Sequence, residues 1–115
     1  MSLTINDAET LITAARHAAD TTGVTVLISG ETSTRKAYTA LQLNAPTADL
    51  VDLVKPDGPF HSLTTALDRP LLFIAGGVPV HRDGRLVGAL GVGGGAPEQD
   101  HSIAIAALQE LTRTR

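Results

Sequence analysis

The sequence predicts an α+β fold in which helices flank a mainly antiparallel β-sheet. Three observations lead to this prediction. Apolar residues recur at helical spacing near both ends of the chain, Asp83-Gly84 separates two β-rich runs as in a hairpin, and 115 residues suit a single domain spanning residues 1–115. Aromatic residues make up 3% of the chain and Cys and Trp are absent, so we expect an aliphatic core.

The first helix is predicted over residues 4–22. Thr4 or Asn6 can cap its start, and Gly23 is a favourable residue just beyond its end. The run over residues 24–28 is rich in β-branched residues and predicts a strand. The apolar positions that follow helical spacing in the first helix are Ile5, Ala8, Leu11, Ile12, Ala15 and Ala19.

The middle of the chain predicts short helices joined by turns. A helix is expected over residues 34–43 and is ended by the segment 44–46, which contains a proline. A second, shorter helix is expected over residues 47–54, followed by a loop over residues 55–59 that is rich in turn residues. One further helical turn is expected within residues 61–66.

The last third of the chain predicts a hairpin followed by a helix. Strands are expected over residues 71–74 and 78–81, and the turn at Asp83-Gly84 leads into a return strand over residues 86–92. Glycines in the return strand leave room for a backbone or a ligand to approach closely. The final helix is expected over residues 97–111, with its proline at the first helical position.

The composition excludes several classes of function. The net charge is −3 and no basic stripe is present, so we expect no nucleic-acid partner. Without cysteine, thiolate metal sites, thiol nucleophiles and disulfide scaffolds are excluded. We find no signal-peptide pattern and no apolar run that could span a bilayer, which predicts a cytoplasmic protein without a membrane partner.

Candidate binding residues occur at the glycine run and on two helices. Gly93, Gly94 and Gly95 connect a predicted strand to a helix, where free N–H groups can bind an anion. Without a following Gly-Lys-Ser/Thr this is not a P-loop, and a small carboxylate site and a plain tight connection both stay open. Arg35 and Lys36 could bind an anionic group at a pocket mouth or could form the polar side of a helix.

Candidate catalytic and metal-ligating residues are few. Glu98, Asp100 and His101 could perform acid–base chemistry, with the glycine turn as oxyanion donor, or the carboxylates could complement the helix dipole. No two histidines have the i, i+4 spacing of a helical metal site, so no intrinsic metal site is predicted. His17 lies on the polar face of its helix and is the candidate axial ligand for a haem iron.

Four motifs follow one another in the C-terminal half: Gly76-Gly77-Val78-Pro79-Val80, Asp83-Gly84, Leu86-Val87-Gly88-Ala89-Leu90-Gly91-Val92-Gly93-Gly94-Gly95 and Glu98-Gln99-Asp100. These motifs resemble the GlcG/HbpS-like family, sometimes described as haem-degrading, which includes the C-terminal domain of PduO-type proteins. Upstream, residues 35–40 and 55–60 resemble that family's Lys-Ala-x-Thr-Ala helix and Pro-Gly-Gly-Pro loop, so the resemblance covers nearly the whole chain. Unlike typical members, the chain passes from residue 28 almost directly into the next helix, which predicts that one hairpin strand is missing.

The resemblance implies a compact α+β domain that forms homo-oligomers and binds a small molecule. Some relatives bind haem or a corrinoid-related cofactor, and one uses a histidine of its N-terminal helix, where this chain has His17. The leading hypothesis is therefore a small-molecule-binding domain whose ligand is haem or another anionic cofactor or metabolite. The alternatives are a small enzyme of lyase, isomerase or cyclase type acting on a pathway intermediate, and a structural accessory subunit.

Overall fold

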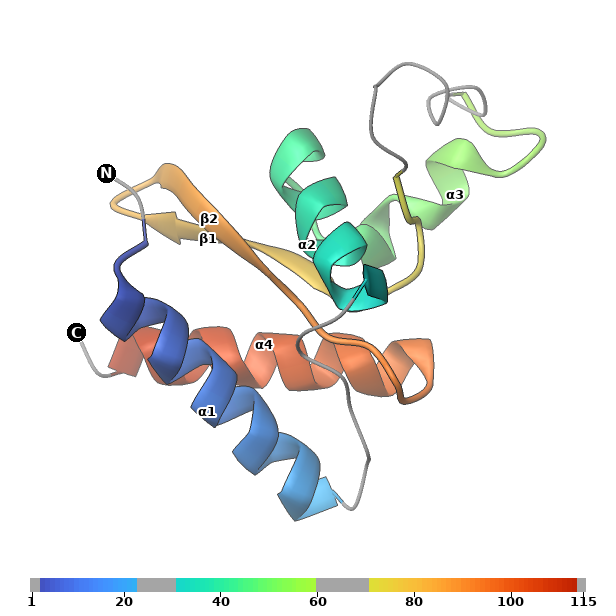
Figure 1. The fold of residues 1–115 in the computed structure, drawn as a ribbon. Coiled ribbons are helices and arrows are strands. Elements are labelled where there is room, and N and C mark those ends of the chain that lie inside the picture. The colour runs from blue at the N-terminus through green and yellow to red at the C-terminus, as the bar shows by residue number, and fades with distance from the viewer. Residues whose placement is uncertain (1–2, 23–30, 60–70, 114–115) are drawn as a thin grey trace.

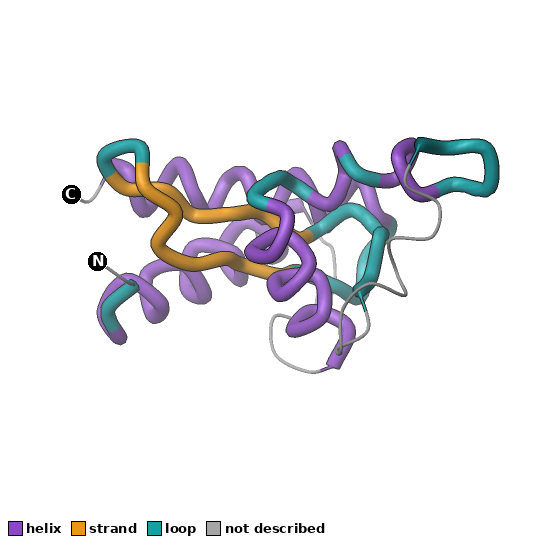
Figure 2. The backbone as a smooth tube through the Cα atoms, turned by 90° about the horizontal axis from the view of Figure 1, so that it is seen from above, coloured by secondary structure: helices purple, strands orange, loops and turns teal. Residues whose placement is uncertain are grey.

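The computed structural model describes residues 3–22, 31–59 and 71–113, and it confirms the α+β fold. Two antiparallel strands form a hairpin with α1 and α4 on one face and α2 on the other (Figure 1). Seen from above, the hairpin lies along α1 and α4 (Figure 2). The elements in chain order are α1 (Ile5–Thr22), α2 (Glu31–Leu43), the 3-10 turn η1 (Thr47–Asp49), α3 (Val51–Val54), β1 (Gly77–Arg82), β2 (Arg85–Gly91) and α4 (Pro97–Arg113).

Helix α1 begins with a reciprocal cap. The backbone N–H of Asp7 donates to Thr4 Oγ1 at 3.0 Å, and the N–H of Thr4 donates to Asp7 Oδ2 at 3.0 Å. Of the two expected caps, the structure therefore uses Thr4. Arg82, at the end of β1, donates to the same carboxylate oxygen of the buried Asp7 at 2.6 Å. This ion pair connects the start of α1 to the hairpin.

The core lies between the hairpin and the paired helices α1 and α4, and small residues let the two helices approach closely. Ile5, expected on the buried face of α1, is instead 78% exposed. At about 100° per residue, Ile5 is rotated by about 120° from Leu11 around the helix, so it cannot join the same stripe. The buried residues of this core are Leu11, Ala15, Ala19, Val78, Val80, Val87, Leu90, Val92, Ile103, Ala104, Ala107 and Leu111.

The hairpin forms where the sequence predicts it. Asp83 and Gly84 both adopt positive φ angles, 54° and 77°, as a two-residue turn with the twist of the flanking strands requires. The register pairs Gly77 with Gly91 and Val78 with Leu90, and it shifts between Val80 and His81 at a bulge. Because side chains alternate along a strand, the valine–leucine pair faces the core and the glycine pair faces α2.

The expected strand over residues 71–74 is wrong, because this segment is irregular up to the start of β1. Threonine hydroxyls bond part of its backbone in place of a neighbouring strand. The N–H of Leu72 donates to Thr39 Oγ1 at 2.9 Å, and Thr47 Oγ1 donates to the carbonyl of Ile74 at 2.8 Å. The strand expected at 24–28, the missing hairpin beside it and the helical turn expected at 61–66 lie outside the described residues.

The glycines of the hairpin let the backbone of α2 approach closely. From the sequence, we expected them to leave room for either a backbone or a ligand. A side chain at Gly91 would overlap the carbonyl oxygen of Ser33, and one at Gly77 would overlap that of Lys36. These two carbonyls are separated by one turn of α2. The helix therefore lies directly on the hairpin backbone across the glycine pair.

We expect Gly91→Ala to lower the free energy of unfolding by about 3 kcal/mol, because the new methyl group meets rigid helix backbone. Gly88→Ala is the matched control, since a methyl group there meets the flexible side chain of Leu3. We expect Gly88→Ala to lower the free energy of unfolding by less than half as much as Gly91→Ala. Urea unfolding monitored by circular dichroism measures both, and equal losses would contradict the close approach of α2.

Candidate functional site

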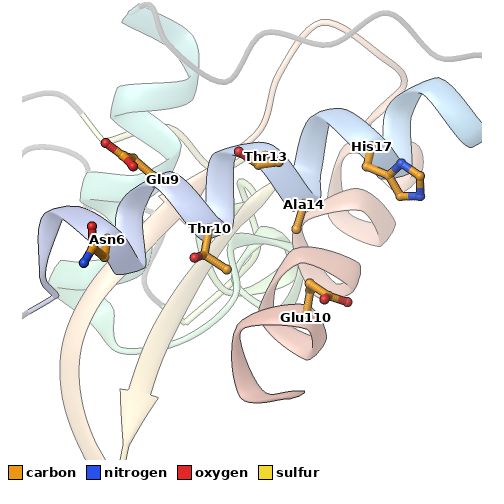
Figure 3. A pocket seen from close by; sticks show the side chains of 7 residues that line it. All are labelled: Asn6, Glu9, Thr10, Thr13, Ala14, His17 and Glu110. Atoms are coloured by element: carbon orange, nitrogen blue, oxygen red, sulfur yellow. The ribbon is translucent and has the colours of Figure 1, made fainter. Parts of the chain in front are cut away.

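An open groove of about 640 Å³ runs along α1 beside the end of α4, and we call it the α1 groove. In Figure 3 its side chains all come from α1 except one, Glu110 from α4. His17 lies toward the C-terminal end of α1 in this view and is exposed. The lining residues are Asn6, Glu9, Thr10, Thr13, Ala14, His17 and Glu110.

The described residues that line the α1 groove are mostly of polar types and include two carboxylates, but none of them is Lys or Arg. Glu9 is exposed, and Glu110 accepts a hydrogen bond from Arg113 at 3.2 Å. The imidazole of His17 is the side chain here that can give a nitrogen to a metal ion. Within the described part of the chain, no group of three or more metal-ligating side chains gathers anywhere.

The glycine run forms a tight connection, and the helix that it leads into bonds the N–H groups of its last residue, Gly95, and of the following Ala96. The N–H of Gly95 donates to Asp100 Oδ1 at 3.0 Å, and the N–H of Ala96 donates to Gln99 Oε1 at 3.0 Å. These two donors are therefore already satisfied by side chains of the first turns of α4. An anion at Gly93–Gly95 would have to displace Asp100 to use the N–H of Gly95.

Lys36 and Asp100 form a buried ion pair, with Nζ and Oδ2 3.2 Å apart and side chains 4% and 2% exposed. The same ammonium group donates to the carbonyl of Val92 at 3.0 Å. Lys36 therefore lies in the interior instead of at a pocket mouth or on a polar helix face. Both carboxylate oxygens of Asp100 are bonded within the protein, one to Lys36 and the other to the N–H of Gly95.

The remaining predicted residues lie apart from His17. Arg35 bonds Glu31 at 2.6 Å on the surface of α2, one helical turn away. Glu98 and His101 line a different groove, at the start of α4. The structure thus separates the predicted trio: Glu98 and His101 share a surface, whereas Asp100 faces inward, as their positions on a helix of 3.6 residues per turn require.

This second groove has a volume of about 590 Å³ and lies between α4 and the segment containing η1 and α3; we call it the apolar groove. Its polar members are Glu98, His101 and Ser102 on α4. Sequence reasoning missed it, because its walls come from three segments far apart in the chain. The apolar side chains that line it are Ala48, Val51, Phe73, Ile74, Ala75 and Pro97.

Residues 25–109 match the family model described as haem degrading protein HbpS-like. The chain belongs to the HbpS-like family. This membership confirms the resemblance to GlcG/HbpS-like proteins that the motifs indicated. Within the described residues, no helix of this member is long and apolar enough to cross a membrane.

Two curated relatives share more than a third of their aligned residues with this chain. Corrinoid adenosyltransferase PduO of Salmonella typhimurium is 37% identical over 86 residues, which are 75% of this chain and 26% of that protein. An uncharacterized Citrobacter freundii protein from the dhaT-dhaS intergenic region is 38% identical over 80 residues, 70% of this chain and 56% of that protein. The match thus spans about a quarter of the length of PduO.

Two solved structures share the fold over almost the whole chain. The crystal structure of a PduOC–haem complex has a TM-score of 0.87 and 29% identity, covering 96% of this chain and 95% of that one. The crystal structure of HbpS has a TM-score of 0.82 and 27% identity, covering 95% and 89%. Both agree with helices packed on an antiparallel sheet.

We expect Lys36→Met to lower the free energy of unfolding by about 3 kcal/mol, because it leaves the carboxylate of Asp100 buried without its cation. Adding Asp100→Asn should recover part of this loss, since the amide oxygen can still accept from Gly95 and no charge is left unpaired. Chemical unfolding of the two single variants and the double variant measures the coupling. Additive losses would contradict the pairing of Lys36 with Asp100.

Proposed function

We propose that this protein is a small-molecule-binding member of the HbpS-like family whose ligand is haem, bound in the α1 groove through His17. The observation that carries the proposal is the exposed imidazole of His17 in the wall of that groove. Imidazole is a common axial ligand of haem iron. The likeness to the PduOC–haem complex, at 29% identity over 96% of the chain, supports haem over other cofactors.

The donor set of the α1 groove fits haem at its iron. The methyl groups of Thr10, Thr13 and Ala14 can contact part of one porphyrin face, while Glu9 and Glu110 disfavour negative charge beside them. The propionates of haem would therefore gain no ion pair from the described side chains that line this groove. Bound haem would supply a redox-active iron, and the chain would supply one axial nitrogen and the orientation of the ring.

From the sequence, Arg35, Lys36 and Gly93–Gly95 were candidates for binding an anionic group. None of them is among the described residues that line the α1 groove. The enzyme alternative has less support than binding, because the Asp100 carboxylate is committed to Lys36 and Gly95. Self-association, which the family resemblance implies, stays a prediction.

Haem titration followed at the Soret band tests the proposal. We expect the wild-type protein to show a saturable shift and His17→Ala to bind at least tenfold more weakly with a different Soret position, because the axial nitrogen is lost. His81→Ala is the matched control, since this exposed histidine bonds Asn44 and does not line the groove. A spectrum and affinity unchanged in His17→Ala would overturn the axial role.

We further expect Glu9→Gln to raise haem affinity about two- to fivefold at low salt, because it removes a carboxylate of the groove whose charge repels the negatively charged haem. The gain should shrink at high salt, where surface charges are screened. Glu31→Gln, which removes a carboxylate on α2, is the control and should change affinity little. Equal effects of the two variants would contradict haem binding beside Glu9.

A further inference from the structure

The two outer edges of the hairpin differ in how they are protected. At the outer edge of β1, the N–H of Gly77 donates to Thr47 Oγ1 at 2.9 Å, and Pro79, two positions on, has no N–H to offer. Such features keep a sheet edge from pairing with another chain. The outer edge of β2 over residues 87–91, which we call the β2 edge, carries neither a proline nor a charged side chain. An edge without such protection is a template for an added strand.

The register shows which backbone groups of β2 point outward. The N–H of Val92 donates to the carbonyl of Gly76 at 2.9 Å, on the β1 side. The N–H of Gly77, which is the partner of Gly91 in the register, points away from β2. Because backbone groups alternate along a strand, the N–H and C=O groups of Ala89 and Gly91 lie on the outer side of β2.

The described residues use little of the β2 edge. The N–H of Leu3 donates to the carbonyl of Val87 at 3.1 Å, as an adjacent strand would. Helix α1 begins at Ile5, so this pairing ends after one bond. An added strand could continue it from Val87 toward Gly91.

A hollow of about 210 Å³ lies beside the β2 edge, between α1 and α2. Pockets for drug-sized ligands measure about 300–1,000 Å³, so this hollow is small for such a ligand but suits an aliphatic side chain. Ile12 of α1 lines it, and Ile5, nearly two helical turns earlier on the same side of the helix, is 78% exposed. The apolar side chains that α1 and α2 contribute to the lining are Ala8, Leu11, Ile12 and Ala37.

We propose that the β2 edge binds an extended peptide segment of a partner protein, which adds a strand to the hairpin and places an aliphatic side chain in the hollow. Backbone bonds to Ala89 and Gly91 supply affinity, and the hollow supplies the preference for an apolar side chain. This site is separate from the α1 groove, because the two share no lining residue. Its occupancy does not depend on haem.

The walls of the hollow determine which kind of partner can enter. Helices α1 and α2 lie on opposite sides of β2 (Figure 1), and both line the hollow beside its edge. A second folded copy presents an edge with the same two helices beside it, so the helices of the two copies would collide. A single extended strand has no such walls and fits between α1 and α2.

Amide hydrogen exchange, followed by NMR in the full chain, tests whether the edge is open. In the free protein we expect the N–H of Leu90, which faces β1, to exchange at least tenfold more slowly than the outward N–H of Ala89. Equally slow exchange at Ala89 would overturn the proposal, because another part of the chain or a second copy would then already pair with this edge.

Three peptides test the recognition itself. The first is acetyl-KTVTVTK-amide, the second carries N-methyl groups on two adjacent central residues, which block both of its edges, and the third has serine in place of each valine. Binding is followed by amide chemical shifts. We expect the first to bind at least fivefold more tightly than the other two and to slow exchange at Ala89. Equal binding of the N-methylated peptide, or shifts centred away from residues 87–91, would overturn the proposal.

The variant Ala89→Pro removes an outward N–H without removing a bond to β1. We expect it to weaken binding of the valine peptide at least fivefold. Undiminished binding by this variant, with the amide shifts of the hairpin intact, would overturn the role of the β2 edge.

A substitution in the hollow provides an independent test. We expect Ile12→Ser to reduce the preference for the valine peptide over the serine peptide to less than twofold, because the apolar wall is lost. Val51→Ser, which removes an exposed apolar side chain of the apolar groove, is the control and should leave the preference unchanged. An equal loss of preference in both variants would overturn the placement of the aliphatic side chain in this hollow.

Discussion

The buried ion pair between Lys36 and Asp100 holds the three layers of this fold in register. Its ammonium group, on α2, reaches past the hairpin to the carboxylate on α4 and also binds the carbonyl of Val92 just after β2. The second carboxylate oxygen bonds the N–H of Gly95, ahead of α4. A buried charge is tolerated when its partner and its hydrogen bonds are all in place, and here one pair joins helix, strand end and turn.

This interaction explains why glycines gather around it. Gly76 has a φ of 131°, and a side chain there would meet the carbonyl of Val92 and the ammonium of Lys36. Gly77 and Gly91 let the backbone of α2 come close enough for Lys36 to reach Asp100. Gly76, Gly77, Gly91 and Asp100, which carry part of the family resemblance, therefore hold the helices and the hairpin together. The two grooves lie beside these residues.

The local parts of the fold were predictable from the sequence and the long-range parts were not. Helical spacing located α1 and α4, and Asp83-Gly84 located the hairpin, because these signals depend on residues close together in the chain. The segment 71–74 has the composition of a strand, but Thr39 and Thr47 bond its backbone from 33 and 27 positions away. Lys36 and Asp100 are 64 positions apart, so no periodic pattern could pair them.

The candidate site residues show the same contrast between local features, which the sequence predicts, and long-range contacts, which it does not. His17 was predictable as exposed because it lies opposite the apolar stripe of α1, whereas its neighbour Glu110 comes from the other end of the chain. Glu98, Asp100 and His101 are close in sequence, but a helix sends adjacent side chains to different sides. Their closeness in sequence predicted one catalytic group. In the fold, Asp100 is buried in the ion pair with Lys36, whereas Glu98 and His101 line the apolar groove.

Helix α4 connects the two grooves and also keeps them apart. His101 and Glu110 are nine positions apart, which is about 14 Å along a helix that rises 1.5 Å per residue. Between them, Ile103, Ala104 and Ala107 are buried against the hairpin and α1, so the intervening turns are fixed by packing. A substitution in one groove is therefore expected to leave the shape of the other groove unchanged, because the packed turns of α4 between them cannot shift easily. The two grooves can therefore change independently, because the side chains that line them are not those that hold the layers together.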